Sequence, residues 1–212
     1  MKSTLTALAA FTTFASAHFN LNYPTVRGFD EDKLGTFPCG SFDTPSTNRS
    51  LWPLTGGEIA LTMGHIDANV EVLIGLGNDV GSAFNTVLRP TFQEQGLGSF
   101  CMTGFSIPEG LNVTEGMNAT IQVQTNGDPD GGLYNCADIT FSNSAPGPAS
   151  GVCTNQTGVS TTTSTVTSPN LTSSSTTSSS SSATSSKSAA VAASASVGGF
   201  MLAAGAAFAL VL

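Results

Sequence analysis

Basic side chains are scarce in this sequence. Its 212 residues include 6 Lys and Arg against 14 Asp and Glu, which gives a net charge of −8. A nucleic-acid-binding face needs clustered Lys and Arg to neutralise phosphates, so we exclude nucleic acid as a partner. A sustained 3.6-residue period is also missing, and only residues 79–97 leave room for one short helical turn.

Motifs of several common enzyme classes are absent as well. No G-x-S-x-G nucleophile elbow occurs, which argues against a hydrolase. The glycines of residues 75–77 precede neither a helix pattern nor a basic residue, which argues against nucleotide binding. The cysteines form no C-x-x-C pair, so a thiolate metal site is not expected.

Four cysteines are present, and in an oxidising compartment they predict two disulfides. Four cysteines allow three pairings, between which the sequence does not decide. We favour Cys39–Cys136 with Cys101–Cys153, because a last cysteine commonly ties the end of a domain back to its body.

Residues 1–17 have the pattern of a signal peptide. Lys2 gives a positive start, residues 5–15 are mostly apolar, and Ala15-Ser16-Ala17 fits the A-x-A cleavage rule. Cleavage there makes His18 the first residue of the mature chain. An N-terminal histidine offers a metal both a ring nitrogen and an α-amine, whose ordinary pKa near 8 lets a divalent metal displace its proton at neutral pH.

The C-terminal part of the chain indicates display at the cell surface. Residues 154–188 are nearly all Ser, Thr and other small residues, which predicts a disordered, O-glycosylated stalk. Residues 189–212 are apolar and uncharged, as in a GPI-attachment signal, with attachment expected near Ser186. An ordinary transmembrane helix is the alternative. The folded domain is then 18–153, on the outer face of the plasma membrane or in the cell wall.

Short segments with a period of two predict an all-β domain. Gly- and Pro-containing turns separate them, so we expect an Ig- or fibronectin-like β-sandwich. The expected strands are 18–23, 58–63, 69–75, 100–107, 119–124 and 135–142, with 28–53 as a long loop and 127–132 as a turn. Five N-glycosylation sequons add to the picture of a surface glycoprotein, at Asn48, Asn112, Asn118, Asn155 and Asn170.

The chain has two histidines, His18 and His65. His65 follows a glycine at the end of an expected strand. Together with the α-amine they offer three nitrogens, a T-shaped set that suits the tetragonal preference of one Cu²⁺ ion. Zinc would prefer a fourth nitrogen or sulfur, and the sequence offers none that is obvious. Asp67 is a candidate oxygen ligand, whereas Asp128 and Asp130 fit turn geometry better.

These motifs carry a family resemblance over residues 18–141. The start His18-Phe19-Asn20-Leu21-Asn22-Tyr23-Pro24, then Pro38-Cys39-Gly40, Gly64-His65 and 134–141 (YNCADITF), resemble fungal copper-binding proteins of the copper-acquisition-factor type. That group is similar in fold to lytic polysaccharide monooxygenases. The resemblance implies a copper-holding histidine brace joined by an Asp, without oxidative cleavage of polysaccharides.

Asp138 is the residue that corresponds to the brace Asp by its place in the strand motif. It shares an expected strand face with Cys136 and Thr140. Asp is disfavoured in strands, so its carboxylate there needs a partner, which a metal or a hydrogen-bond donor would provide.

Three functions remain open at this level. The first is a monomeric, non-enzymatic copper protein that serves copper acquisition or the cell wall, with a membrane copper transporter or a wall glycan as partner. The second is a copper monooxygenase that cuts a wall glycan. The third is a metal-free adhesion module on a stalk.

Monooxygenases commonly have a Tyr or Phe in the axial position of the copper, with a His and a Gln or Glu nearby. This chain has no third His, and Tyr134 is out of register with Asp138. Gln122 and Gln124 cannot be placed from sequence.

Overall fold

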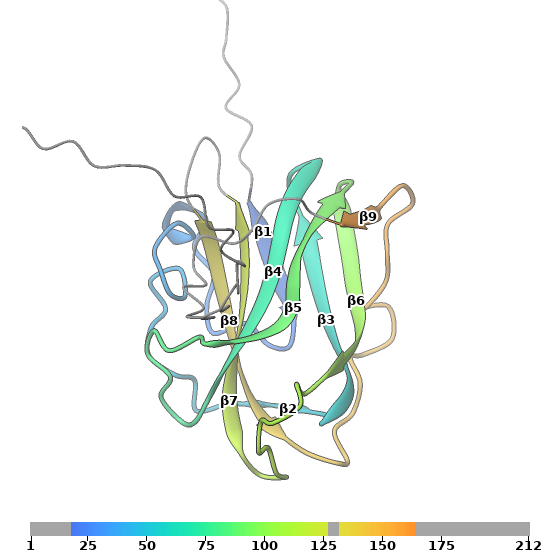
Figure 1. Ribbon diagram of the computed structural model, residues 1–212. Coiled ribbons are helices and arrows are strands. Elements are labelled where there is room, and N and C mark those ends of the chain that lie inside the picture. The colour runs from blue at the N-terminus through green and yellow to red at the C-terminus, as the bar shows by residue number, and fades with distance from the viewer. Residues whose placement is uncertain (1–17, 127–131, 164–212) are drawn as a thin grey trace, which may run out of the picture. The chain divides into compact units, whose positions relative to one another are not determined.

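A computed structural model describes residues 18–126 and 132–163 of the chain (Figure 1). All of them belong to the first of two units into which the chain divides, residues 1–172. Apart from one short 3-10 helix, η1 (Glu31–Lys33), the regular structure within them is β-strand. The strands are β1 (Phe19–Tyr23), β2 (Ser50–Trp52), β3 (Thr55–Met63), β4 (Asp67–Leu76), β5 (Thr86–Gln95), β6 (Gly98–Ser106), β7 (Asn118–Asn126), β8 (Gly132–Phe141) and β9 (Ser160–Thr163).

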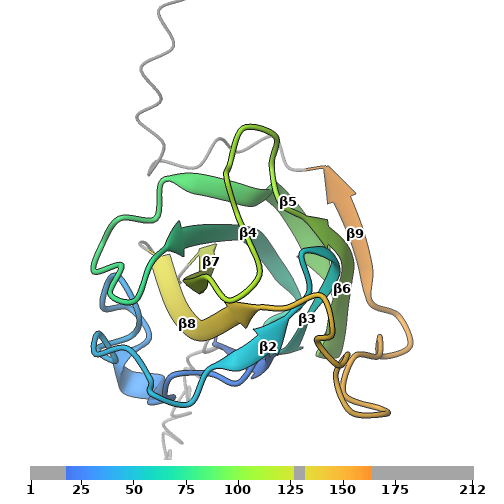
Figure 2. The same cartoon turned by 90° about the horizontal axis from the view of Figure 1, so that it is seen from below.

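The strands form two sheets that enclose one hydrophobic core. One sheet has the order β1-β3-β6 and the other β2-β8-β7-β4-β5-β9. Alternate residues of both sheets point into the same cluster, as the period of two predicts. Figures 1 and 2 show the two layers from the side and from below. The core includes Phe19, Leu21, Ile59, Leu61, Val70, Val72, Ile121, Val123, Ile139 and Phe141, all at most 2% exposed.

Trp52, the single tryptophan of the chain, is part of this core. Its side chain is 0% exposed and packs against the rings of Phe105 and Phe141. The indole nitrogen donates a hydrogen bond to the carbonyl of Glu58. A Cβ on Gly57 would lie 2.2 Å from the indole, so only glycine leaves room for the ring. Aromatic burial of this kind contributes several kcal/mol, of the order of 3.

The expected all-β sandwich is confirmed, and so are both favoured disulfides, Cys39–Cys136 and Cys101–Cys153. The strands predicted from period-two segments correspond to β1, β3, β4, β6, β7 and β8, with ends that differ by a few residues. The turn at 127–132 falls mainly on residues outside the described ranges. The register Asn126↔Gly132 flanks it, as in a hairpin.

Three strands were not expected, and a helical turn in 79–97 was wrong, because β5 lies there. Between the pairs Val70↔Phe92 and Val72↔Arg89, β5 has two residues where β4 has one. This bulge takes up Pro90 and breaks the alternation by which a strand is recognised. The short β2 lies at the end of the predicted loop 28–53, and pairs in parallel with β8.

One strand lies beyond the domain boundary expected at residue 153. The strand β9 pairs with the end of β5, from Phe92↔Thr163 to Gln95↔Ser160, so the sandwich extends into the segment predicted as stalk. All four residues of β9 are polar and exposed, which explains why no apolar pattern marks them. The described residues contain no helix long and apolar enough to cross a membrane.

Candidate metal site

Both histidines lie at the end of the β1–β3 ladder. Phe19 pairs with Met63, and one residue further the amide of Gly64 donates to the carbonyl of His18 over 2.8 Å. A Cβ on Gly64 would lie 2.6 Å from that carbonyl oxygen, so a glycine is needed for the close approach. His65 follows directly. The ladder therefore brings His18 and His65, which are 47 positions apart in sequence, to the same end of the sheet.

The ring of His65 is oriented by its own turn. Nδ1 lies 2.7 Å from the carbonyl oxygen of Asp67, so Nδ1 carries the proton and donates it to that acceptor. This tautomer leaves the lone pair on Nε2. Metal-binding histidines are typically fixed in this way by a hydrogen bond from the other ring nitrogen. Asp67 acts here through its main chain, while its carboxylate oxygen Oδ1 accepts from Nε2 of Gln93 over 2.7 Å.

The ring of His18 faces a carboxylate that the sequence did not single out. Nδ1 of His18 lies 2.9 Å from Oε1 of Glu31, and the two side chains are 30% and 60% exposed. Glu31 opens the 3-10 helix η1, whose N-cap Asp30 accepts a hydrogen bond from the amide of Asp32. The only sequence signal was the acidic run at residues 30–32, which by itself does not show which member reaches the histidine.

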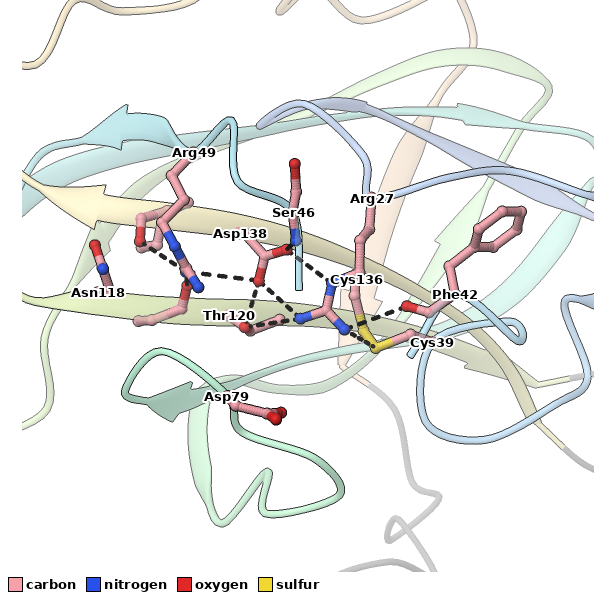
Figure 3. Close-up of polar contacts among 12 residues, drawn as sticks. Arg27, Cys39, Phe42, Ser46, Arg49, Asp79, Asn118, Thr120, Cys136 and Asp138 are labelled. Carbon is pink, nitrogen blue, oxygen red and sulfur yellow. Dashed lines mark hydrogen bonds and ion pairs between the residues drawn. A yellow bond between two sulfur atoms is a disulfide. The ribbon is translucent and has the colours of Figure 1, made fainter. Parts of the chain in front are cut away.

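Asp138, predicted as the oxygen ligand of the brace, lies in a network of polar contacts in the structure. Its carboxylate forms a two-pronged ion pair with Arg27, through Nε to Oδ2 at 2.8 Å and Nη2 to Oδ1 at 2.7 Å (Figure 3). The hydroxyl of Thr120 donates to Oδ1 and the amide of Ser46 to Oδ2, each over 2.7 Å. Arg49 adds a second cation, with Nη1 3.6 Å from Oδ1. The side chain of Asp138 is 0% exposed.

This arrangement does not support a ligand role for Asp138. Burial alone would raise the pKa of Asp138, but hydrogen bonds from Arg27, Thr120 and Ser46 hold the pKa below its ordinary value. Cys136 and Asp138 lie on one face of β8, as expected from the alternation of a strand. The carboxylate of Asp138 needs a partner on this face. The partner is a guanidinium.

The ion pair secures the loop that carries Glu31. Besides Asp138, Arg27 contacts Sγ of Cys39 at 3.5 Å and donates to the carbonyls of Phe42 and Asp43. The disulfide Cys39–Cys136 ties the same loop to β8. Figure 3 shows the guanidinium of Arg27 between the carboxylate and the disulfide. Asp138 therefore acts on the β1–β3 end indirectly, by holding the loop in place.

The donors at the β1–β3 end fit a brace of two imidazoles and one amine. Among residues 18–126 and 132–163, no three His, Cys, Asp or Glu side chains are grouped to hold a metal ion. Asp128 and Asp130 lie outside the described residues.

Comparison with known proteins identifies the family. The family model "copper acquisition factor BIM1-like" matches residues 16–158. The chain belongs to this family. An uncharacterised Aspergillus fumigatus protein is 50% identical over 165 residues, which cover 76% of this chain and 68% of that protein. The lytic polysaccharide monooxygenase-like protein ham-7 of Neurospora crassa is 36% identical, over 66% of this chain and 70% of that protein.

A third BIM1-like relative has a name that refers to copper. Copper acquisition factor BIM1 of Cryptococcus neoformans var. grubii is 32% identical over 158 residues, which cover 68% of this chain and 69% of that protein. Membership of the family gives this chain a copper-related role, and its likeness to monooxygenase-like proteins agrees with the sandwich. The family resemblance stated from the sequence is thereby confirmed.

Proposed function

We propose that this BIM1-like chain is a cell-surface protein that binds one Cu²⁺ ion for copper acquisition or homeostasis, or at the fungal cell wall, without oxidising polysaccharides. The ligands are the α-amine and ring of His18 and the ring of His65. The observation that carries the proposal is the hydrogen bond from Gly64 to His18, which brings both histidines to the β1–β3 end. The family and the names of its copper acquisition factors add support.

The chain's own groups account for the proton balance of binding. The α-amine gives up a proton, which is easy near its ordinary pKa of about 8. In the neutral ring of His65, Nε2 offers its lone pair to the metal, because Nδ1 donates to the carbonyl of Asp67. Glu31, at 2.9 Å from Nδ1 of His18, places a negative charge where the cation arrives. Copper is the cargo here. A set of nitrogen ligands like this one binds Cu²⁺ more tightly than it binds other divalent first-row metals.

The contacts of Gln122, Gln124 and Tyr134 support a binding role. Nε2 of Gln122 donates a hydrogen bond to the carbonyl of Pro38, and Nε2 of Gln124 donates one to the carboxylate of Glu71. The ring of Tyr134 packs edge-on against Phe37. These side chains therefore have structural partners of their own. A monooxygenase would need an aromatic residue and a polar side chain held at the copper.

One observation favours the alternative, a copper-dependent monooxygenase that acts on a wall glycan. Glu94 on β5 pairs with Ala68 on β4, and Ala68 lies three residues after His65 in the sequence. The side chain of Glu94 is 0% exposed. Neither carboxyl oxygen has a hydrogen-bond partner among the described residues. A buried acid near this end would suit oxygen chemistry. Incubation with chitin, glucan or cellulose, reductant and peroxide separates the two functions, since oxidised oligosaccharides would establish the enzyme.

Display at the surface is the second part of the proposal. It rests on the predicted signal peptide 1–17, the Ser/Thr-rich segment and the GPI-type tail with attachment near Ser186, of which residues 1–17 and 164–212 lie outside the described ranges. The BIM1-like region, 16–158, begins where the signal peptide ends. Phosphatidylinositol-specific phospholipase C should release the protein from intact cells. Retention after treatment would favour the transmembrane alternative.

The deciding experiment uses protein secreted by a fungal host. N-terminal sequencing should start at His18, and titration calorimetry should give one Cu²⁺ site far tighter than millimolar. Electron paramagnetic resonance should show a tetragonal signal with nitrogen couplings. His65→Ala, and a chain with one extra Ala before His18, should each lose this signal. Glu109→Gln, which changes an exposed loop carboxylate, is the matched control. Affinity no tighter than millimolar, or unchanged after either alteration, would refute the brace.

A further inference from the structure

Strand β6 forms one edge of the three-stranded sheet. It pairs with β3 on one side, and no strand of the described residues pairs with its other side. Free edges expose N–H and C=O groups that can pair with a second chain, so proteins cover or block them. In this chain, a main-chain group covers one position of the edge. The amide of Gln156 donates to the carbonyl of Ser99 over 2.7 Å.

Two side chains cover the next positions of the same edge. Oδ1 of Asn155 accepts from the amide of Cys101 over 2.7 Å, and Nη2 of Arg89 donates to the carbonyl of Thr103 over 2.8 Å. The disulfide Cys101–Cys153 holds the segment beside the strand. Residues 155 and 156 thus take the place of a neighbouring strand along the first part of β6.

Asn155 is also the first residue of the sequon Asn155-Gln156-Thr157. N-linked oligosaccharide is attached to the side-chain nitrogen of Asn. The hydrogen bond to Cys101 uses the oxygen instead, so attachment leaves this bond intact. Asn155 and Thr157 are both exposed. The sequon can therefore be modified without disturbing the edge contact.

A groove of about 860 Å³ is lined by residues of β5, β6 and β9, and Asn155 is one of its lining residues. In both views β9 lies beside β6 on this side of the sandwich (Figures 1 and 2). Its lining combines threonine hydroxyls with apolar surface, including Thr103, Thr161, Thr162, Pro90 and Phe92. Sugar rings present hydroxyls at their rims and apolar faces between them, which suits such a lining.

The sequon at Asn118 gives the opposite picture. Nδ2 of Asn118, the atom that would carry a glycan, donates to Oδ1 of Asn78 over 2.6 Å. Thr120, the third residue of this sequon, is 0% exposed, and its hydroxyl donates to Asp138. A glycan at Asn118 would displace the contact with Asn78 beside this buried network. Asn48 and Asn112 lie in exposed loops, and Asn170 is outside the described residues.

We propose that Asn155 carries an N-linked oligosaccharide that occupies the groove between β6 and β9 and shields this partly covered edge of β6 from a second copy of the chain. The same reasoning assigns no glycan to Asn118. This inference rests on the secretion put forward under the proposed function, because glycans are added in the secretory pathway. It is independent of copper.

Glycopeptide mass spectrometry of the secreted, full-length chain tests the assignment. We expect Asn155 to be occupied and Asn118 to be bare. Occupancy of Asn112 with Asn155 bare would overturn the inference while leaving secretion intact. A chain that is bare at every sequon would overturn the secretion together with the inference.

The shielding role needs variants that separate the glycan from the edge contact. Thr157→Ala removes the glycan and keeps the Asn155 side chain, Asn155→Asp removes the glycan and keeps an acceptor oxygen, and Asn112→Gln is the control at an exposed loop sequon. Light scattering after size exclusion should show self-association of the first two at concentrations where wild type and the control are monomers. Two monomeric variants would overturn the shielding role.

Hydrogen exchange at the amide of Cys101 reports the edge contact itself. Protection should persist in Thr157→Ala, whereas Asn155→Ala, which also removes the acceptor oxygen, should exchange about tenfold faster. Equal exchange in these two variants would overturn the role of the Asn155 oxygen.

Discussion

Glu94 makes the stability of this protein depend on pH. Burial, and secondarily the charge of Asp67, raises the pKa of Glu94 from its ordinary value near 4.5 to about 7. The folded state therefore keeps a proton that the unfolded chain loses between pH 4.5 and 7. Unfolding free energy falls as pH rises through this window, by about 3 kcal/mol at about 1.36 kcal/mol per pH unit, and this contribution stays constant above pH 7.

Glu94→Gln removes this titration, since the amide has nearly the shape of the protonated acid and no charge. The variant should lack the loss of about 3 kcal/mol between pH 4.5 and 8, which corresponds to about 6–12 °C in Tm. Its absolute stability will differ for a separate reason, because a buried amide needs hydrogen-bond donors and acceptors. The pH dependence is therefore the quantity to compare.

Fluorescence of Trp52 provides the assay, because the chain has one tryptophan and its side chain is 0% exposed in the fold. Urea unfolding at pH 4.5, 6 and 8, in chelator to exclude metal, gives the free energies. Glu109→Gln removes an exposed carboxylate and controls for the change in net charge. Parallel pH profiles for wild type and Glu94→Gln would refute the reasoning and indicate that Glu94 is solvated. Asp67→Asn should move the wild-type loss to lower pH.

Three further substitutions test the site and its support. Asp138→Asn leaves the buried guanidinium of Arg27 without its counter-charge and should cost about 3–5 kcal/mol in urea unfolding; loss of copper from a folded variant would restore a ligand role for Asp138. Glu31→Gln should weaken Cu²⁺ binding by less than about tenfold in calorimetry, since this carboxylate is mostly exposed; no change would remove Glu31 from the site. Gly64→Ala forces a Cβ against the carbonyl of His18 and should weaken copper binding much more than Glu31→Gln; equal affinity to wild type would contradict that close approach.

Sequence reasoning predicted the elements with regular alternation and missed those without it. Strands such as β4 and β7, with three or more alternate apolar residues facing one core, were recognised because burial sets their pattern. β9 is polar throughout and exists because the edge of β5 is available to it. It is held by its pairing with β5 and by a hydrogen bond from the hydroxyl of Thr162 to Oε1 of Gln93, neither of which needs an apolar residue pattern.

The candidate site shows the same division. His18 and His65 were singled out from the sequence because histidine is scarce in this chain and one of them follows a predicted cleavage signal, and their role as copper ligands stays a prediction. Asp138 was placed on the right strand face, but the nature of its partner depends on Arg27, 111 positions away, reaching over β8. Glu31 was missed for a related reason. Many carboxylates lie in loops, and only the folded path of residues 24–49 decides which one approaches His18.

The β1–β3 end separates folding from maturation. His18 joins the ladder through its carbonyl oxygen, which Gly64 contacts whether or not another residue precedes His18. A chain made in an oxidising compartment with one extra residue before His18 should therefore fold with both disulfides, pass every test of structural integrity, and still lack the amine that completes the proposed ligand set. Recombinant samples of this protein should be judged by the identity of their first residue, since melting temperature and chromatographic behaviour will not distinguish a competent chain from an incompetent one.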